Sequence, residues 1–272
     1  MNFTNRQWRL VSYPAGMPTE SNWAMSESPI PEPGSGSMLV RAIYLDVAPY
    51  MRGRISPQKN YAAGVSPGEL MVGGAIGQVV SSNTPAYQSG QIVVTSHAFG
   101  WQEFAVSDGN NLRRVDAGLG PLSTALGILG MPGMPAYFGF LEIGQPRPGD
   151  TVVVSAASGA VGQVVGQISK IMGCRTVGIA GAAEKVEYLK SDLGFDAGIN
   201  YKTENVDAAL TKVCPLGVDV YFDNVGGVIT DAVFDHLNLG ARISICGSIS
   251  QYNQDEPEPG PRKMGLLVGK QT

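Results

Sequence analysis

The sequence has few of the residues from which disulfide frameworks and metal centres are built. Among its 272 residues are only three cysteines and two histidines. Cys174, Cys214 and Cys246 lie far apart and form no CxxC pair, which predicts free thiols in a reducing compartment, the cytoplasm. With only His97 and His236 to add, a zinc site of Cys and His ligands is hard to build. We therefore expect no metal.

Charge and long apolar runs are scarce as well. Only 15% of the residues are charged, the net charge is −4 and the pI is about 5.2. A chain of this kind lacks the basic footprint of a nucleic-acid-binding protein. No apolar run reaches membrane-spanning length, and the first residues lack the apolar core of a secretory signal. The 43% of hydrophobic residues is enough for about two domains with their own cores. We expect a globular protein without nucleic-acid or membrane partners.

Glycine and proline, in contrast, are abundant, with 36 and 18 residues. In the first part of the chain they separate short stretches rich in strand-forming residues. The pattern predicts strands over residues 39–47, 71–80, 91–96 and 101–106. Short strands at this spacing are typical of a compact β-barrel or sandwich. We assign residues 1–121 to this first domain.

From residue 122 onward the pattern changes to alternating strands and helices. Residues 123–144 are apolar and broken at Pro132 and Pro135, which predicts turns or helix starts there. The sequence then predicts strands and helices in turn, with strands over 151–156, 175–180, 196–201, 218–225 and 241–247 and helices over 161–172 and 182–194. Such alternation predicts an α/β domain over 122–272, with a doubly wound parallel sheet covered on both faces.

A glycine-rich turn follows the first strand of this second domain. Residues 156–162 read AASGAVG, and a helix with one apolar face follows. Gly159 and Gly162 allow the backbone to approach a diphosphate, and the N-terminus of the helix offers free N–H groups. Glycine-rich turns also occur for packing alone, but a strand before and a helix after are the context that dinucleotide binding requires. We therefore predict a dinucleotide site here.

The end of the second strand indicates which dinucleotide would bind. An NAD site usually has an acidic residue there, which accepts from the ribose 2′-hydroxyl. This chain has Gly181, Ala182 and Ala183, followed by Lys185. The uncharged turn leaves room for a 2′-phosphate, to which Lys185 can donate a charge-assisted hydrogen bond. The alternative is that Lys185 is only a solvated residue of a first helical turn. We favour NADP(H).

Further polar and small residues follow the remaining strands at the same edge of the sheet: Tyr201, Asn224, Gly226, Gly227, Cys246, Gly247 and Tyr252. Tyr201 could cover the adenine-ribose side of the cofactor. We expect Cys246 to be a small buried residue without a chemical role. A phenol such as that of Tyr252 can donate to an oxyanion that develops on a substrate, although a surface tyrosine is the alternative.

Several catalytic arrangements are missing. No tyrosine is followed four residues later by a lysine, which argues against the short-chain dehydrogenases, and no G-x-S-x-G elbow occurs. His97 has no evident carboxylate or thiol partner in the sequence, and His236 is expected to be structural. Hydride transfer without metal or strong side-chain base remains, with the cofactor supplying the chemistry.

Six segments carry a more specific resemblance: residues 49–54 (PYMRGR), 100–104 (GWQEF), 129–139 (LGMPGMPAYFG), 156–167 (AASGAVGQVVGQ), 222–227 (FDNVGG) and 246–253 (CGSISQYN). The chain resembles the zinc-independent medium-chain dehydrogenase/reductases, within them the double-bond reductases of the leukotriene B4 12-hydroxydehydrogenase, prostaglandin reductase and curcumin reductase group. The resemblance implies a GroES-like β-barrel domain before a Rossmann domain, with the active site in the cleft between them.

It also implies an NADPH-dependent reduction of the carbon–carbon double bond of α,β-unsaturated ketones or aldehydes. Hydride would add to the β-carbon, and a proton would then reach the α-carbon of the enolate. Tyr50 and Tyr252 would face the substrate oxygen, with Arg52 nearby. Arg52 and Arg54 could instead be solvated charges that close a turn. The implied NADPH-binding residues are Gly159, Ala160, Val161, Gly162, Gln163, Lys185, Tyr201, Asn224, Cys246, Gly247, Ser248, Ile249, Ser250 and Tyr252.

Two departures from the family pattern stand out. Ala48 replaces the aspartate that usually precedes PYMR, so a hydrogen bond that fixes this loop is expected to be absent. The chain also ends at Thr272, before the last Rossmann strand and the segment that returns to the first domain, as a fragment or a natural truncation would. The full-length protein would be a homodimer. A quinone reductase of the same superfamily and a non-catalytic nucleotide-binding protein stay open as alternatives.

Overall fold

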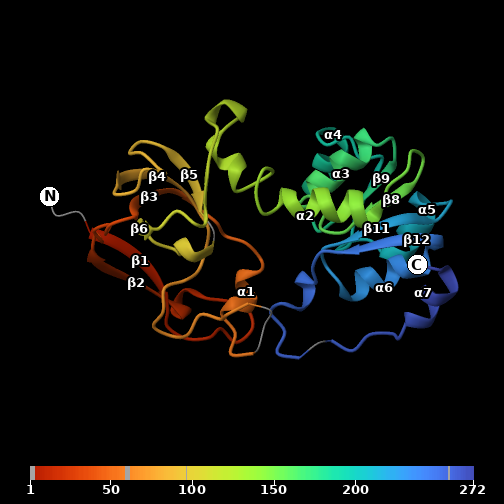
Figure 1. The fold of residues 1–272 in the computed structure, drawn as a ribbon. Coiled ribbons are helices and arrows are strands. Elements are labelled where there is room, and N and C mark those ends of the chain that lie inside the picture. The colour runs from red at the N-terminus through yellow and green to blue at the C-terminus, as the bar shows by residue number, and fades with distance from the viewer. Residues whose placement is uncertain (1–3, 59–61, 96, 257) are drawn as a thin grey trace. The chain divides into compact units, whose positions relative to one another are not determined.

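The computed structural model describes residues 4–58, 62–95, 97–256 and 258–272, and it divides the chain into two compact units (Figure 1). The units are Met1–Leu126 and Gly127–Thr272. The division falls slightly beyond the predicted boundary after residue 121. A short helix, η4 (Leu122–Ala125), stays with the first unit, because the side chain of Leu126 lies against Gly74.

Two antiparallel sheets form the first unit. In one, β1 (Thr4–Leu10) pairs with β2 (Trp23–Pro29). The other has the order β6 (Phe104–Ser107), β3 (Met38–Leu45), β4 (Ala75–Ser82), β5 (Ile92–Thr95) and β7 (Leu112–Arg114). Short helices connect them: η1 (Glu20–Asn22), α1 (Met51–Arg54), η2 (His97–Phe99) and η3 (Ala117–Leu119). Single bridges pair Gln7 of β1 with Gln102 and Arg9 of β1 with Leu70, two residues that lie outside the strands.

The predicted strands of this unit correspond to β3, β4, β5 and β6, with Ser96 outside the described residues. The prediction for 71–80 began too early, because β4 starts at Ala75. A Cβ atom on Gly73 would lie 2.8 Å from Cδ1 of Trp101, so the chain there passes close to a neighbouring ring instead of pairing. Strand β1 was not predicted, since it buries the polar Asn5, whose amide donates to the backbone of Phe104.

The second unit contains the predicted parallel sheet. Its order is β10 (Ala197–Asn200), β9 (Arg175–Ala180), β8 (Thr151–Val154), β11 (Val218–Asp223) and β12 (Leu237–Ile245), and every pair is parallel. The order reverses between β8 and β11, which is where such sheets bind ligands. The α/β prediction with a doubly wound sheet is confirmed.

Helices cover both faces of this sheet. Val152 and Val154 pack with α3 (Gly162–Ile171) and with Leu189 of α4 (Ala183–Ser191). Val153 faces the other way, toward α5 (Val206–Val213) and α6 (Gly227–Asp235). Figure 1 shows α3 and α6 on opposite sides of the sheet. Alternate residues of one buried strand therefore serve two cores.

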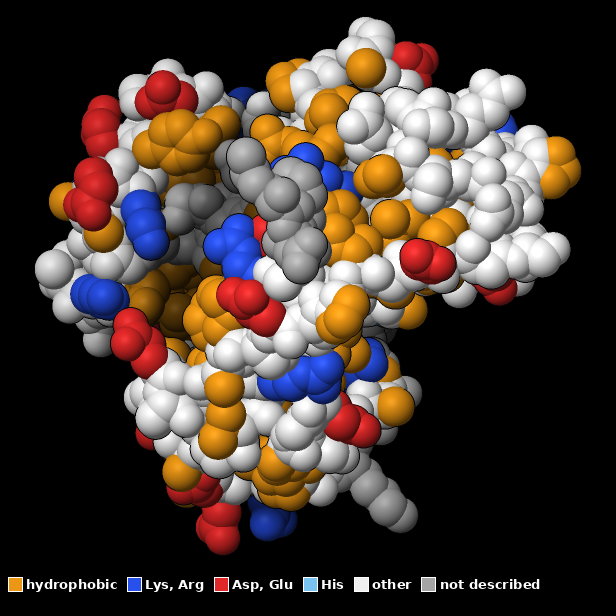
Figure 2. Space-filling model, turned by 90° about the vertical axis from the view of Figure 1, so that its left-hand side faces the viewer, with side chains coloured by type: hydrophobic (Ala, Val, Ile, Leu, Met, Phe, Trp, Pro, Cys, Tyr) orange, Lys and Arg blue, Asp and Glu red, His pale blue; other side chains and the backbone are white. Residues whose placement is uncertain are grey.

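The helices outside the alternation are short: α2 (Gly133–Phe138), its wider continuation η5 (Gly139–Gly144), η6 (Ile249–Gln251) and α7 (Met264–Lys270). Pro132 caps α2 and Pro135 lies in its first turn, where a missing N–H costs little, so the predicted helix start is confirmed. Among the described residues, no helix has the length and apolarity to cross a membrane. On the face in Figure 2, acidic and basic side chains are scattered among hydrophobic ones.

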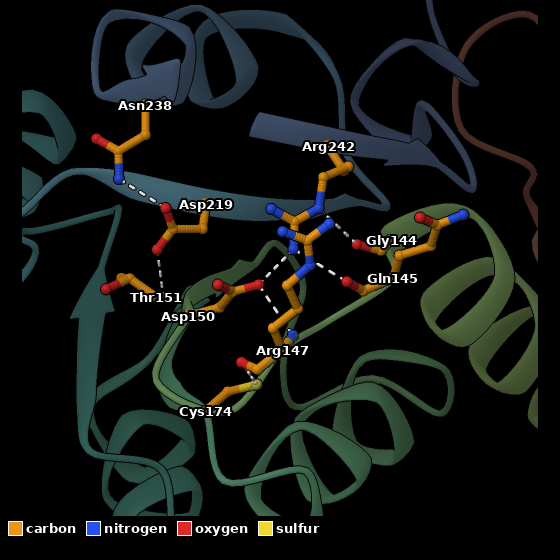
Figure 3. A network of polar contacts seen from close by, with 9 residues as sticks. All are labelled: Gly144, Gln145, Arg147, Asp150, Thr151, Cys174, Asp219, Asn238 and Arg242. Carbon is orange, nitrogen blue, oxygen red and sulfur yellow. Dashed lines mark hydrogen bonds and ion pairs between the residues drawn. The ribbon is translucent and has the colours of Figure 1, made fainter. Parts of the chain in front are cut away.

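A polar network closes the amino ends of β8, β11 and β12 (Figure 3). Arg242 binds the Asp150 carboxylate and donates to the carbonyl of Gly144 at 3.1 Å. Asp219 accepts from the backbone N of Thr151 and from Nδ2 of Asn238, both at 2.8 Å. Because parallel sheets bind ligands at the carboxyl ends of their strands, this network has a structural role.

Candidate functional site

The predicted glycine turn at the carboxyl end of β8 is compact. Ala156 is left-handed, with φ 47°, and its carbonyl oxygen accepts from the backbone N of Gly159 at 2.9 Å. A Cβ atom on Gly162 would lie 2.5 Å from that same oxygen. Only glycine fits at residue 162 without moving the turn.

The start of α3 meets the requirements of a diphosphate site. The first ladder bond belongs to Gln163, whose N–H donates to the carbonyl of Gly159 at 3.0 Å. In the described part of the chain, the N–H groups of Ala160, Val161 and Gly162 have no hydrogen-bond acceptor. Three unpaired donors at the positive end of a helix suit an anion.

Close packing behind the turn explains a further glycine. A Cβ atom on Gly166 would lie 1.9 Å from Cζ of Phe195. The ring of Phe195 therefore occupies the space that a side chain would need, and α3 lies close to the sheet. This is the packing that the third glycine of dinucleotide-binding turns permits.

The end of β9 is uncharged, as the sequence indicates. The ring of Tyr201 lies against Gly181, because a Cβ atom there would be 2.7 Å from Cε1 of the tyrosine. The structure thus brings Tyr201 from the end of β10 to the end of β9. Lys185 is exposed in the first turn of α4, beside Glu184, an exposed acid that the sequence reading passed over.

Asp223 at the end of β11 is a residue that sequence reasoning missed. It is only 2% exposed. Its carboxylate accepts five hydrogen bonds, from Oγ of Ser155 (3.0 Å), the hydroxyl of Tyr221 (2.9 Å), the backbone N of Val225 (2.9 Å) and Gly226 (3.0 Å), and Oγ1 of Thr230 (2.6 Å). A buried acid is stable only when it is bonded in this way. The signal in the sequence was an aspartate closing an apolar strand before a double glycine.

Asn224 joins the ends of the two strands at the switch point. Its backbone N donates to Oγ of Ser155 and its side-chain Nδ2 to the carbonyl of Ser155, both at 2.8 Å. The predicted cofactor residue Asn224 is therefore held firmly beside the end of β8.

The loop after β12 is held against the loop after β11. The N–H groups of Cys246 and Gly247 donate to the carbonyl of Asp223 at 2.8 and 3.1 Å. Ser250 donates to the carbonyl of Val225 through both its backbone N (3.1 Å) and its Oγ (2.6 Å). The structure thus brings predicted residues 246–252 together with residues 224–227.

Cys246 and Tyr252 lie in this loop. The expectation that Cys246 is buried was wrong, since the residue is exposed, because it follows the last residue of an edge strand. Partial desolvation of the thiol and the nearby Asp223 raise the pKa of Cys246. The hydroxyl of Tyr252 folds back over the loop and accepts from the backbone N of Ser248 at 3.4 Å.

In the first unit, Tyr50 lies within a polar cluster. Its hydroxyl donates to Oδ2 of Asp46 at 3.3 Å and lies 3.5 Å from Nδ1 of His97. The sequence shows no evident carboxylate partner for His97, but in the folded unit Asp46, which is far away in sequence, shares the Tyr50 hydroxyl with it. Asp46 also supplies a carboxylate to the loop in which Ala48 replaces the usual aspartate. Burial raises the pKa of Asp46, although the hydrogen bond from Tyr50 and the charge of protonated His97 lower it.

Arg52 is bonded to backbone. One of its terminal nitrogens donates to the carbonyls of Gly16 at 3.1 Å and Pro14 at 3.4 Å. It is therefore more than a solvated charge, and it fastens the loop after β1. Nε of Arg54 is buried and has no hydrogen-bond partner among the described residues.

His236 follows α6, and its Nε2 lies 2.8 Å from Oδ1 of Asp207 in α5. It links two helices, which is the structural role expected for it. Within the described ranges, no three His, Cys, Asp or Glu side chains are grouped so that they could hold a metal ion.

Comparisons with known proteins agree with this geometry. A family described as the N-terminal domain of oxidoreductase matches residues 6–115, and one described as zinc-binding dehydrogenase matches residues 160–268. The chain is 46% identical to the NADPH-dependent curcumin reductase of Escherichia coli, covering 97% of this chain and 76% of that protein. It is 45% identical to rat prostaglandin reductase 1, over 94% and 76%.

Among solved structures, CurA from Vibrio vulnificus in complex with NADPH superposes with a TM-score of 0.91. It is 48% identical, and the match covers 97% of this chain and 78% of that one. By its sequence, its parallel sheet and the loops at the carboxyl edge of that sheet, the chain belongs to the zinc-independent medium-chain dehydrogenase/reductases, in the double-bond reductase group.

Proposed function

We propose that this protein reduces the carbon–carbon double bond of α,β-unsaturated ketones and aldehydes with NADPH. The observation that carries the proposal is the turn after β8, where the N–H groups of Ala160, Val161 and Gly162 have no acceptor among the described residues, which supports binding of an anion. It occurs in a chain 46% identical to an NADPH-dependent curcumin reductase. When bound, NADPH supplies the hydride that adds to the β-carbon of the substrate.

The second domain, residues 122–272, holds the cofactor in this proposal. The N–H groups of Ala160, Val161 and Gly162 would bind the diphosphate, and Lys185 the 2′-phosphate. Tyr201 would cover the adenine-ribose side. The other predicted cofactor residues lie at the carboxyl ends of β8, β11 and β12: Gly159 and Gln163 after β8, Asn224 after β11, and Cys246, Gly247, Ser248, Ile249, Ser250 and Tyr252 after β12.

Tyr50 and Tyr252 are the residues to which we assign contact with the substrate oxygen. A hydroxyl that donates to the carbonyl oxygen stabilises the negative charge developing there, and it can then give up its proton. Arg52 supports this region through its bonds to the carbonyls of Pro14 and Gly16.

We also infer that the full-length protein acts as a homodimer in the cytoplasm. Strand β12 is an edge of the sheet and exposes Leu239 and Ile245, which supports pairing with a second copy. Three free cysteines support a reducing compartment. Analytical ultracentrifugation tests the homodimer, and fractionation of cells tests the cytoplasmic location.

Loss of NADPH absorbance in the presence of a simple enone, an enal and a quinone tests the activity. We expect turnover of the enone and the enal. Turnover of the quinone alone would favour a quinone reductase, and NADPH binding without turnover of any of the three would favour a non-catalytic protein.

A pair of glycine variants tests the cofactor site. Gly162→Ala places a Cβ 2.5 Å from a backbone oxygen, whereas Gly265→Ala, also near a helix start, meets no atom within 4 Å. We expect the first to weaken NADPH binding at least about tenfold, or 1.4 kcal/mol, and the second to leave it unchanged. Equal affinities of the two variants would contradict the site.

A further inference from the structure

Asp46, Tyr50 and His97 are brought together from three segments of the first unit. Asp46 follows β3, Tyr50 precedes α1, and His97 begins η2. The backbone of Asp46 is held on both sides, since its N donates to the carbonyl of Gly74 at 2.8 Å and its carbonyl accepts from Nε1 of Trp101 at 2.9 Å. The carboxylate therefore has a defined position beside the tyrosine.

The hydroxyl of Tyr50 lies between Asp46 and His97 and contacts both side chains. The Tyr50 hydroxyl donates its proton toward Oδ2 of Asp46. Its oxygen lies 3.5 Å from Nδ1 of His97, and the two rings meet edge to face with centroids 5.5 Å apart. When Nδ1 carries a proton, it can donate to the hydroxyl oxygen.

The charges in the cluster support proton movement. Protonated His97 favours the ionised form of Asp46, whereas burial disfavours it and raises the pKa of that carboxyl group. A tyrosine that gives away its proton in a partly buried site becomes an anion, which is costly unless a donor is close. His97 is such a donor.

We propose that Asp46 and His97 are positioning residues for the hydroxyl of Tyr50, and that His97 replaces the proton which Tyr50 gives to the substrate. This inference rests on the proposed function, in which hydride addition leaves an enolate. The Tyr50 hydroxyl turns from Oδ2 of Asp46 toward the enolate oxygen. Its O–H bond then breaks and the proton binds that oxygen, giving an enol that tautomerises to the product. The Nδ1–H bond of the His97 imidazolium breaks as the O–H bond of Tyr50 forms again. Neutral His97 then takes a proton from water, and Asp46 keeps its charge throughout.

A double-mutant cycle tests the relay. We expect Tyr50→Phe, Asp46→Asn and His97→Ala each to lower kcat for an enone about 100-fold, with KM little changed. Because the residues act as one unit, adding Asp46→Asn or His97→Ala to Tyr50→Phe should lower kcat no further. His236→Ala is the matched control, since its imidazole also faces a carboxylate, that of Asp207, and kcat should not change.

Chemical rescue separates proton supply from packing. Imidazole in the buffer should restore part of kcat to His97→Ala and nothing to Tyr50→Phe, and Asp46→Glu should keep more activity than Asp46→Asn. NADPH binding by each variant reports on folding. Additive losses of kcat in the double variants, a rise in KM alone, or no rescue by imidazole would overturn the proton transfer from His97 to Tyr50. In each of these cases turnover of enones by the wild type would still uphold the proposed function. A wild-type protein that binds NADPH but turns over no enone overturns both.

Discussion

The replacement Asp223→Ala should weaken both the fold and the binding of NADPH, although we assign no cofactor contact to this carboxylate. Asp223 lies at the end of β11 and orders the two loops that follow β11 and β12. Its side chain accepts from the backbone N of Val225 and Gly226, and its carbonyl accepts from the N of Cys246 and Gly247.

The magnitude follows from the donors left without an acceptor. The N–H groups of Val225 and Gly226 cannot turn elsewhere, and each costs roughly 1–3 kcal/mol. The hydroxyls of Tyr221 and Thr230 lie 3.1 Å apart and can bond to each other. Part of this lost free energy is recovered, because the variant no longer buries a charged carboxylate. We therefore expect the free energy of unfolding to fall by about 3 kcal/mol for Asp223→Ala and by about 1–2 kcal/mol for Asp223→Asn, which keeps an acceptor.

Urea denaturation measures the change in stability, and fluorescence titration measures the Kd for NADPH. Loosening of residues 224–227 should raise this Kd about tenfold or more. Asp219→Asn is the matched control on the same strand. Asp219 bonds Thr151 and Asn238 at the opposite end of the sheet (Figure 3), so its loss should cost stability without changing the Kd.

Two results would refute this reasoning. The first is an Asp223→Ala protein as stable as the wild type, which would mean that the buried donors find other acceptors. The second is an equal change of Kd in the Asp219 and Asp223 variants, which would mean that the loop after β11 does not depend on the carboxylate.

Three other predictions concern separate parts of the second unit. Lys185→Ala should weaken NADPH binding by about 1.5–3 kcal/mol and leave NADH binding unchanged, and equal losses in the two titrations would count against a 2′-phosphate contact. Gly166→Ala gains about 1 kcal/mol of helix propensity but places a Cβ 1.9 Å from Phe195, so the melting temperature should fall; a rise would mean that the ring moves at little cost. Burial would raise the pKa of Asp196, but hydrogen bonds, chiefly from Lys170, outweigh it, and the folded pKa is lowered. The stability that Asp196 contributes is therefore present above the unfolded pKa of the carboxyl group and is lost as pH falls through its folded pKa. Asp196→Asn should thus lower the free energy of unfolding at neutral pH and have the same free energy of unfolding as the wild type in strong acid.

Local pattern was enough to predict much of the second unit. A continuous apolar run predicts β8, and an apolar face at helical spacing predicts α3, because burial repeats with the period of the element. The glycines of the turn were also readable, since residues 156–162 are one short segment whose contacts are made mainly within itself and with its own strand and helix. The six motifs then indicated the family that the comparisons establish.

Tertiary structure decided the contacts that join distant residues. Nothing near Asp46 in the sequence indicates that His97 shares the hydroxyl of Tyr50 with it, because β3, α1 and η2 meet only in the folded unit. The five donors around Asp223 likewise come from Ser155 directly after β8, from β11, from α6 and from the turn between β11 and α6. Periodicity reports which face of an element is buried, whereas the partner of a buried polar group depends on which other elements reach that place.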